Sequence, residues 1–469
     1  MTARTRTLWT FAITSVALFM VTLDNLVVTT ALPVIRRSLH ADLAQLEWTV
    51  NAFTLTFAVL LLTGAALGDR FGRRRMFVIG LTLFTAGSAF AALAPSASAL
   101  IAARAVQGAG GAMVLPLTLT LLSAAVPPER RGVFLGAWGA IAGLAVAVGP
   151  IVGGAVVQGI SWQWIFWLNV PIGLLLAPLA LLRLQESRGA DRTLDLRGLA
   201  LGSAGLFGVV WGLVRANTLG WGSPQIVGSL AGGAVVVAIF VLYEARAKRP
   251  MLPMRFFGNR TFTGANLASL LMYFGMFGSV FLLAQFFQTV QGLSPLGAGL
   301  RILPWTAMPL LVAPIAGALS DRISGRTILA LGLALQATGL LWIGLATSPA
   351  APYSTFIIPF VLSGAGMGMF FAPVANLVLS SVRRDQEGKA SGANNAIREL
   401  GGVLGVAVLA SIFAHTGGYT SGAAFVAGVQ PAIIVGSIVV LAGAIAAALI
   451  PGRRSLAAAP AVEEVAVAA

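Results

Sequence analysis

Apolar runs long enough to cross a lipid bilayer recur along almost the whole chain, separated by short polar segments. A helix needs about 20 apolar residues to span the hydrocarbon core, and these runs are of that length. Only 10% of the 469 residues are charged, whereas soluble domains carry about 25%. We therefore predict an all-α membrane protein with fourteen transmembrane helices. Their approximate ranges are 8–33, 46–68, 76–94, 98–125, 132–157, 164–183, 197–214, 224–243, 262–290, 297–319, 327–346, 353–380, 389–413 and 431–450.

The distribution of positive charge predicts how these helices are oriented. Most of the 30 lysines and arginines fall in segments that alternate helices place on one side of the membrane. Positive loops stay in the cytoplasm, so we expect both termini to be cytoplasmic in a multi-pass plasma-membrane protein, such as one of a bacterial inner membrane. The same asymmetry explains the net charge of +15 without a nucleic-acid partner. The other side holds Arg36, Arg37, Arg215 and, at a helix edge, Arg301.

The residues available for chemistry exclude several classes of site. The chain has no cysteine and two histidines, His40 and His415, which argues against disulfides, thiolate sites and histidine-based metal or triad sites. It also lacks a Walker-type phosphate loop and a Gly-x-Ser-x-Gly nucleophile motif. We expect no cofactor, no metal and no enzymatic activity.

An internal repeat divides the chain into two similar halves. The segment 64–74 after the second apolar run resembles 317–326 after the tenth, and Gly108-Ala109-Gly110 matches Gly364-Ala365-Gly366. Transporters with such repeats bind substrate near the midplane, between the halves. Duplicated packing without transport remains an alternative. The expected domains are an amino-terminal six-helix bundle (1–183), a linker with two extra helices (184–261), a carboxy-terminal six-helix bundle (262–450) and a disordered cytoplasmic tail (451–469).

Asp24 lies inside the first apolar run, where a carboxylate costs several kcal/mol to bury. At 1.5 Å per residue, Asp24 lies about 14 Å and Arg104 about 9 Å below the same membrane face, so the two side chains can meet. An arginine beside a buried carboxylate opposes the effect of desolvation on its proton affinity. The pair is therefore either a proton-coupling site or a static ion pair that holds two helices together.

A second acid, Glu399, lies near mid-depth in the thirteenth run, beside Arg398. Asn394 and Arg398 share one face of that helix, and Glu399 is a further candidate for proton coupling. Aromatic and amide side chains of the ninth and tenth runs suit adaptable binding of amphipathic molecules, although core packing is the alternative for each. The residues expected to contact substrate are Asn25, Gln107, Tyr273, Phe274, Gln285, Trp305, Asn395 and Arg398.

Several motifs together resemble those of one transporter family. They are the loop Leu67–Arg75, the helix segment Arg104–Ala112, the segment Gly149–Gly154, the string Trp162–Pro171 and the opening stretch Leu23–Pro33. With these motifs the chain resembles the fourteen-helix members of the major facilitator superfamily, in the drug:H+ antiporter-2 group. The departures are Ala65 where the loop motif has glycine and Gln163 where arginine is usual.

The resemblance implies a function and roles for the motif residues. The implied function is proton-coupled export of amphipathic drugs or natural products by alternating access, with protons and the lipid bilayer as partners and a monomer as the working unit. Export of one endogenous metabolite or antibiotic is the alternative, and a membrane scaffold or sensor is a remote one. The implied gate-loop residues are Asp69, Arg70, Gly72 and Arg73, with Asp321 and Arg322 in the second copy. The implied antiporter motif is Gly149, Pro150, Gly153 and Gly154.

Overall fold

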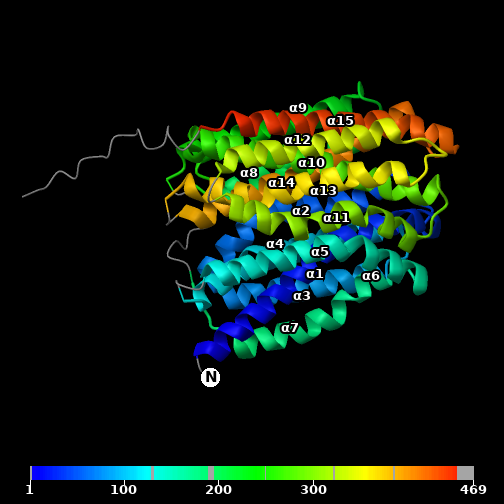
Figure 1. The fold of residues 1–469 in the computed structure, drawn as a ribbon. Helices are drawn as coiled ribbons and strands as arrows, with labels where there is room; N and C mark the ends of the chain where they lie inside the picture. Colours follow the sequence, from blue (N-terminus) through cyan, green and yellow to red (C-terminus); the bar gives the residue numbers. More distant parts are fainter. Residues whose placement is uncertain are drawn as a thin grey trace, which may run out of the picture.

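The computed structural model describes residues 3–127, 131–188, 195–248, 250–320, 323–383 and 386–451, and these residues form helices and no strands. Figure 1 shows the helices lying side by side as one bundle. The helices are α1 (Ala3–Ser38), α2 (Leu43–Phe71), α3 (Arg73–Ala92), α4 (Ala97–Ala125), α5 (Arg131–Gly159), α6 (Trp164–Trp167), α7 (Asn169–Arg183), α8 (Leu196–Leu219), α9 (Pro224–Arg246), the 3-10 helix η2 (Met254–Gly258), α10 (Arg260–Thr289), α11 (Pro295–Leu319), α12 (Gly325–Ala346), α13 (Ser354–Ser380), α14 (Glu387–Thr416) and α15 (Gly422–Ala448).

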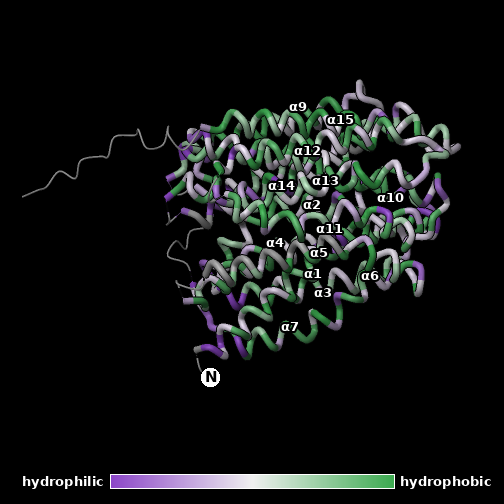
Figure 2. The backbone as a smooth tube through the Cα atoms, viewed as in Figure 1, coloured by the Kyte–Doolittle hydropathy of each residue, from purple (hydrophilic) through white to green (hydrophobic). Residues whose placement is uncertain are grey.

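Twelve helical segments in the described part of the chain are long and apolar enough to cross a membrane, and one of them, Trp164–Arg183, is α6 together with α7. The helix α2 is a thirteenth when its two arms, bent by 48° between Leu61 and Thr63, count as one span. The second part of α5 adds a shorter apolar segment, Val148–Gly159. Hydrophilic residues gather toward the two ends of the bundle, whereas apolar residues follow the helices between them (Figure 2). The prediction of an all-α, multi-pass membrane protein is confirmed.

One predicted span is interrupted. The range 164–183 consists of α6 and α7, which meet at Leu168. Pro171 is the third residue of α7 and has no backbone N–H to donate to the carbonyl of Trp167. The missing hydrogen bond coincides with the break. The predicted disordered tail lies almost wholly in 452–469, outside the described residues.

The helices pack in two similar sets. In the first set α4 contacts α2 and α3, α1 contacts α5, and α3 contacts α7. In the second set α13 contacts α11 and α12, and α10 contacts α14 and α15. The two sets meet mainly where α5 packs on α11 and where α2 packs on α14.

The repeated glycines occupy equivalent places in these two sets. A Cβ on Gly108 of α4 would overlap the backbone of Phe53 on α2, and a Cβ on Gly364 of α13 would overlap the backbone of Trp305 on α11. Only glycine permits such close approach of two helices. The sequence repeat therefore corresponds to a repeat in packing.

The inserted helices α8 and α9 form a hairpin beside the seam between α2 and α14. Their backbones approach closely at Gly205, Gly208 and Gly233, and α8 also contacts α2 and α14. At one end of the hairpin the hydroxyl of Tyr243 donates to Asp195 Oδ1 at 2.9 Å. The hairpin of α8 and α9 thus covers the outside of the seam and belongs to neither of the two helix sets.

Candidate functional site

Asp24 is 2% exposed and its carboxylate is held by three side chains from other helices. Arg104 Nη1 of α4 forms an ion pair and hydrogen bond with Oδ2. Gln107 Nε2 of α4 and Asn169 Nδ2 of α7 each donate to Oδ1 at 2.7 Å. The contact that the depth estimate permitted between Asp24 and Arg104 is therefore present.

Arg104 is also enclosed by groups beyond Asp24. Its Nε donates to the backbone carbonyl of Thr49 on α2 at 3.2 Å, and its Nη1 donates to Gln107 Oε1 at 2.7 Å. Its guanidinium carbon lies 4.3 Å from the centroid of the Phe53 ring. Nη2 is buried without a hydrogen-bond partner among the described residues. A desolvated cation with a free donor depends on the charge of Asp24 for its stability.

Two members of this network were missed by the sequence reasoning as site residues. Asn169 stands inside the string Trp162–Pro171, and Ser88 on α3 accepts a hydrogen bond from Gln107 Nε2 at 2.7 Å. The motif containing Asn169 was the available signal for it. Ser88 belongs to no motif, and a single serine in an apolar span gives no signal of its partner.

A cavity of about 100 Å³ lies between the two sets of helices. Its walls are mainly aromatic, aliphatic and methionine side chains. Three lining residues each carry a buried polar atom without a hydrogen-bond partner among the described residues: Asn25 Oδ1, Trp305 Nε1 and Glu399 Oε2. Pockets for drug-sized ligands hold roughly 300–1,000 Å³, so such a ligand requires the cavity to widen. The lining residues are Val21, Thr22, Asn25, Leu26, Phe53, Phe57, Leu115, Pro150, Tyr273, Met276, Phe277, Val280, Trp305, Thr306, Met367, Phe371 and Glu399.

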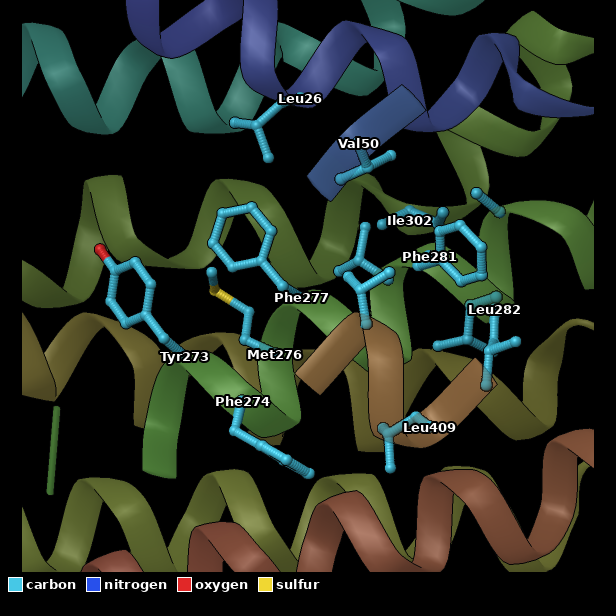
Figure 3. Packing of buried hydrophobic residues seen from close by; sticks show 14 of the residues in the cluster. Leu26, Val50, Tyr273, Phe274, Met276, Phe277, Phe281, Leu282, Ile302 and Leu409 are labelled. Carbon is cyan, nitrogen blue, oxygen red and sulfur yellow. The ribbon is translucent and has the colours of Figure 1, made fainter. Parts of the chain in front are cut away.

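One face of α10 supplies much of this wall. Figure 3 shows Tyr273, Met276 and Phe277 pointing toward Leu26 of α1, and Phe274 pointing the other way. Gln285 also does not line the cavity, because its Oε1 accepts a hydrogen bond from the Tyr419 hydroxyl at 2.5 Å.

The remaining expected substrate contacts divide in the same way. Asn25, Tyr273 and Trp305 line the cavity, whereas Gln107, Asn395 and Arg398 do not. Gln107 serves the Asp24 network instead.

The polar groups of α14 contact different partners. Arg398 hydrogen-bonds the Tyr273 hydroxyl and lies 4.5 Å from the centroid of that ring, and its Nη1 donates to Asn395 Oδ1 at 3.3 Å. Asn394 does not join Arg398, because its amide donates to Asn266 and Ser269 on α10. Glu399 is therefore the charged residue of α14 that lines the cavity, while Arg398 is covered by aromatic rings.

The glycines of α5 lie where three helices meet. A Cβ on Gly149 would lie 2.8 Å from Leu26 Cβ of α1, and a Cβ on Gly153 would overlap Thr30. A Cβ on Gly154 would overlap Pro295 at the start of α11. The segment Gly149–Gly154, which includes Pro150 in the cavity wall, thus forms part of the contact between the two sets.

The loop between α2 and α3 is held by an acidic side chain that follows α7 in the sequence. Asp69 and Arg73 form an ion pair at 2.8 Å, and the Arg70 guanidinium lies 5.2 Å from the centroid of the Phe71 ring. Gly72 has φ 112°, a conformation that favours glycine. Glu186 after α7 accepts from the backbone N–H groups of Arg74 and Arg75 at 3.0 and 3.2 Å.

The linker residue Glu186 therefore caps α3, and no sequence motif indicates this contact. In the second copy of the loop, Asp321 and Arg322 lie outside the described residues.

Comparison with known proteins places these features in a family. Residues 14–406 and 265–466 match the Major Facilitator Superfamily. The chain is 35% identical over 403 residues to a tetracenomycin C resistance and export protein of Streptomyces glaucescens, covering 85% of this chain and 74% of that protein. It is 37% identical over 412 residues to a cephamycin export protein of Amycolatopsis lactamdurans, covering 86% and 84%. It is 35% identical over 409 residues to a multidrug resistance protein of Mycobacterium tuberculosis, covering 87% and 76%.

Solved structures agree with this assignment at the level of the fold. A bacterial homologue of the human lysosomal transporter Spinster superposes with a TM-score of 0.67 at 15% identity, covering 95% of this chain and 97% of that one. The human organic anion transporter MFSD10 gives 0.62 at 15% identity, covering 95% and 100%. The fold, the paired helix sets and these similarities lead to one conclusion: the chain belongs to the major facilitator superfamily.

Proposed function

We propose that the protein is a proton-coupled exporter of amphipathic drugs or natural products, working by alternating access. In this proposal fourteen helices cross the membrane, both termini are cytoplasmic, and the halves 1–183 and 262–450 rock against each other around the cavity. The inserted helices α8 and α9 lie beside the seam. The end of the bundle at which α1 ends and α2 begins, called the outer end below, then faces outside.

The main observation behind the proposal is that the buried acid Asp24 is connected to the cavity through Arg104 and the Phe53 ring. Asp24 is bound to Arg104, Arg104 lies against Phe53, and Phe53 lines the cavity. A proton on Asp24 removes the charge that stabilises the buried guanidinium, so Arg104 has to shift toward other partners, and Phe53 is in its way. Occupation of the cavity and protonation of Asp24 can therefore oppose each other, which is the requirement for antiport.

The three unpartnered polar atoms in the cavity suit it to ligands that carry a few polar groups on an apolar body. Glu399 is the acid among them, and we assign it to substrate contact or to a second coupling step. Relatives named for export of single antibiotics and relatives named for multidrug resistance are similarly close to this chain. A dedicated exporter therefore remains the second candidate, and a resistance panel in a pump-deficient host separates the two.

The function is tested in proteoliposomes that contain the purified protein and a pH-sensitive dye. Ethidium is the first probe, followed by neutral and anionic antibiotics. The wild type should move protons when a substrate is added against a pH gradient, and Asp24→Asn should insert normally and move none. Asp42→Asn is the matched control, because Asp42 caps α2 in an exposed loop. Equal proton movement by wild type and Asp24→Asn would contradict the proposal.

A further inference from the structure

Two buried polar side chains on α2 stand apart from the Asp24 network. Glu47 is 2% exposed and Asn51 is 0% exposed. Glu47 Oε2, Asn51 Oδ1 and Asn51 Nδ2 have no hydrogen-bond partner among the described residues. Burying a polar group without a partner destabilises a protein, and burying a charged group does so more strongly. Buried polar atoms without a partner are rare in native proteins, so a cluster of them points to a specific role.

The position of these residues connects them to the movement of the halves. Glu47, Asn51 and Leu55 are spaced four residues apart and share one face of α2. Leu55 packs in one cluster with Val403 and Ala407 of α14, and with Val210 of α8. The face therefore turns toward the seam between the two sets of helices, and Glu47 is its member nearest the outer end.

At the outer end the halves are joined by specific contacts. The Arg36 guanidinium of α1 lies 3.7 Å from the centroid of the Tyr419 ring, which belongs to the loop between α14 and α15. Gln288 Nε2 of α10 donates to the carbonyl of Thr30 on α1 at 2.8 Å. We call these contacts the outer clamp. Burial raises the pKa of Tyr419, Arg36 lowers it and Glu47 raises it, so Glu47 lies within electrostatic reach of the clamp.

The charged groups around Glu47 leave it without a dedicated cation. Asp42, at the amino end of α2, lies five residues before Glu47 and carries the same negative charge. Arg36 is engaged with Tyr419. Arg104 of α4 reaches the neighbouring backbone at Thr49 but is paired with Asp24. Arg215 of α8 and His415 of α14, near the ends of their helices, are exposed.

We propose that Glu47 is a second proton-binding residue, which has to carry a proton for the outer clamp to close. This inference rests on the proposed function, because it takes the outer end to open to the outside medium. In the open form Glu47 is hydrated and ionised. Closing the clamp over an ionised, unpaired carboxylate is strongly unfavourable, so a proton is first taken up from the outside medium. The proton returns there when the clamp reopens. Glu47 thereby sets the pH at which the outer end closes, while Asp24 carries the transported proton.

The test measures the width of the outer end directly. The chain contains no cysteine, so Ser98→Cys at the start of α4 and Ser348→Cys after α12, both exposed, give a unique pair for spin labels. Distances are recorded by double electron–electron resonance in nanodiscs from acidic to alkaline pH. The labelled protein should be closed at low pH and increasingly open at high pH. Glu47→Gln, a neutral isostere, should stay closed throughout, which shifts the open-to-closed ratio at high pH by roughly tenfold or more.

Two further variants keep the proposal falsifiable. Glu47→Asp retains the acid and should restore the pH dependence. Asp42→Asn removes a neighbouring negative charge but keeps the Glu47 carboxyl, so it should keep a pH dependence with its midpoint at lower pH. In the Asp24→Asn background the pH dependence should persist, because it does not come from the transported proton. A pH-independent wild type, or a Glu47→Gln variant that opens like the wild type, overturns the proposal. The proposal is also overturned if Asp24→Asn removes the pH dependence while Glu47 is unchanged. That result would leave the proposed role of Asp24 in transport intact.

Discussion

The Arg104 guanidinium lies 4.3 Å from the centroid of the Phe53 ring, and the same ring lines the central cavity. Phe53 therefore touches both the charged network around Asp24 and the space available to substrate. The corresponding place in the second half is aromatic, because Phe360 stacks on Trp305 with ring centroids 6.0 Å apart. The two halves share a helix arrangement, but only the first contains this acid–arginine network in the described part of the chain.

Replacing Phe53 by leucine should weaken the link between cavity and network. A cation–π contact contributes about 0.5–2 kcal/mol, which corresponds to a loss of roughly two- to thirty-fold in substrate-driven proton movement. Phe57→Leu is the control, since Phe57 lines the cavity and stacks on Phe53. Dye-based proton flux in proteoliposomes measures both. If the two variants lose activity equally, the ring acts only as cavity wall.

Removing the Asn169 amide should weaken the coupling of transport to protons. Asn169 Nδ2 donates to Asp24 Oδ1 at 2.7 Å, so Asn169→Ala removes one of the three side chains that hold the carboxylate. A hydrogen bond to a charged group is worth about 1.5–3 kcal/mol, which corresponds to a loss of roughly ten- to hundredfold in substrate-driven proton movement. Asn394→Ala removes a buried amide from the other half and should leave proton movement unchanged. Unaltered proton movement in Asn169→Ala contradicts this role.

A side chain at Gly154 should prevent the halves from closing at the outer end. A Cβ there would lie 2.5 Å from Leu296 Cα of α11, so Gly154→Val should abolish transport while the protein still inserts. Gly159→Val on the same helix meets nothing within 4 Å and should be tolerated. The spin-label pair described above reports the open outer end expected of Gly154→Val. A closed outer end in this variant rules out the explanation.

Neutralising Glu399 should alter which substrates are transported. Glu399 lines the cavity, and its Oε2 has no hydrogen-bond partner among the described residues, so the carboxylate is available to a cationic ligand. Glu399→Gln should weaken ethidium transport by roughly tenfold, as expected for loss of a charge-assisted contact, and affect a neutral substrate little. Equal losses for both substrates would assign Glu399 to coupling instead of recognition.

The parts of the structure that depend on length and depth could be predicted from the sequence. Helix placement follows from the apolar runs, and the Asp24–Arg104 contact follows from two charges at similar depth. Phe274 and Gln285 were expected to contact substrate because α10 carries several aromatic and amide groups. In the most apolar stretch of this helix 83% of the residues are buried, so hydrophobicity does not indicate which face of the helix meets the cavity.

Neutral and boundary residues were the hardest to predict. Asn169 and Ser88 carry no charge, and a buried amide or hydroxyl can find a partner on any neighbouring helix. Glu47 is the fifth residue of α2, and a sequence-based boundary that is uncertain by a few residues cannot separate an acid in the loop from an acid in the span. Only the packing of α2 on α14 identifies it as buried.

The most direct test of the account is the release of protons on substrate binding, measured without a membrane gradient. A compound that the proteoliposome assay identifies as transported is added to detergent-solubilised protein in weakly buffered solution with a pH indicator. The account predicts that the wild type and Asp42→Asn release protons on binding and that Asp24→Asn binds the compound without releasing any. Proton release by Asp24→Asn equal to that of the wild type would contradict the assignment of Asp24 as the coupling acid.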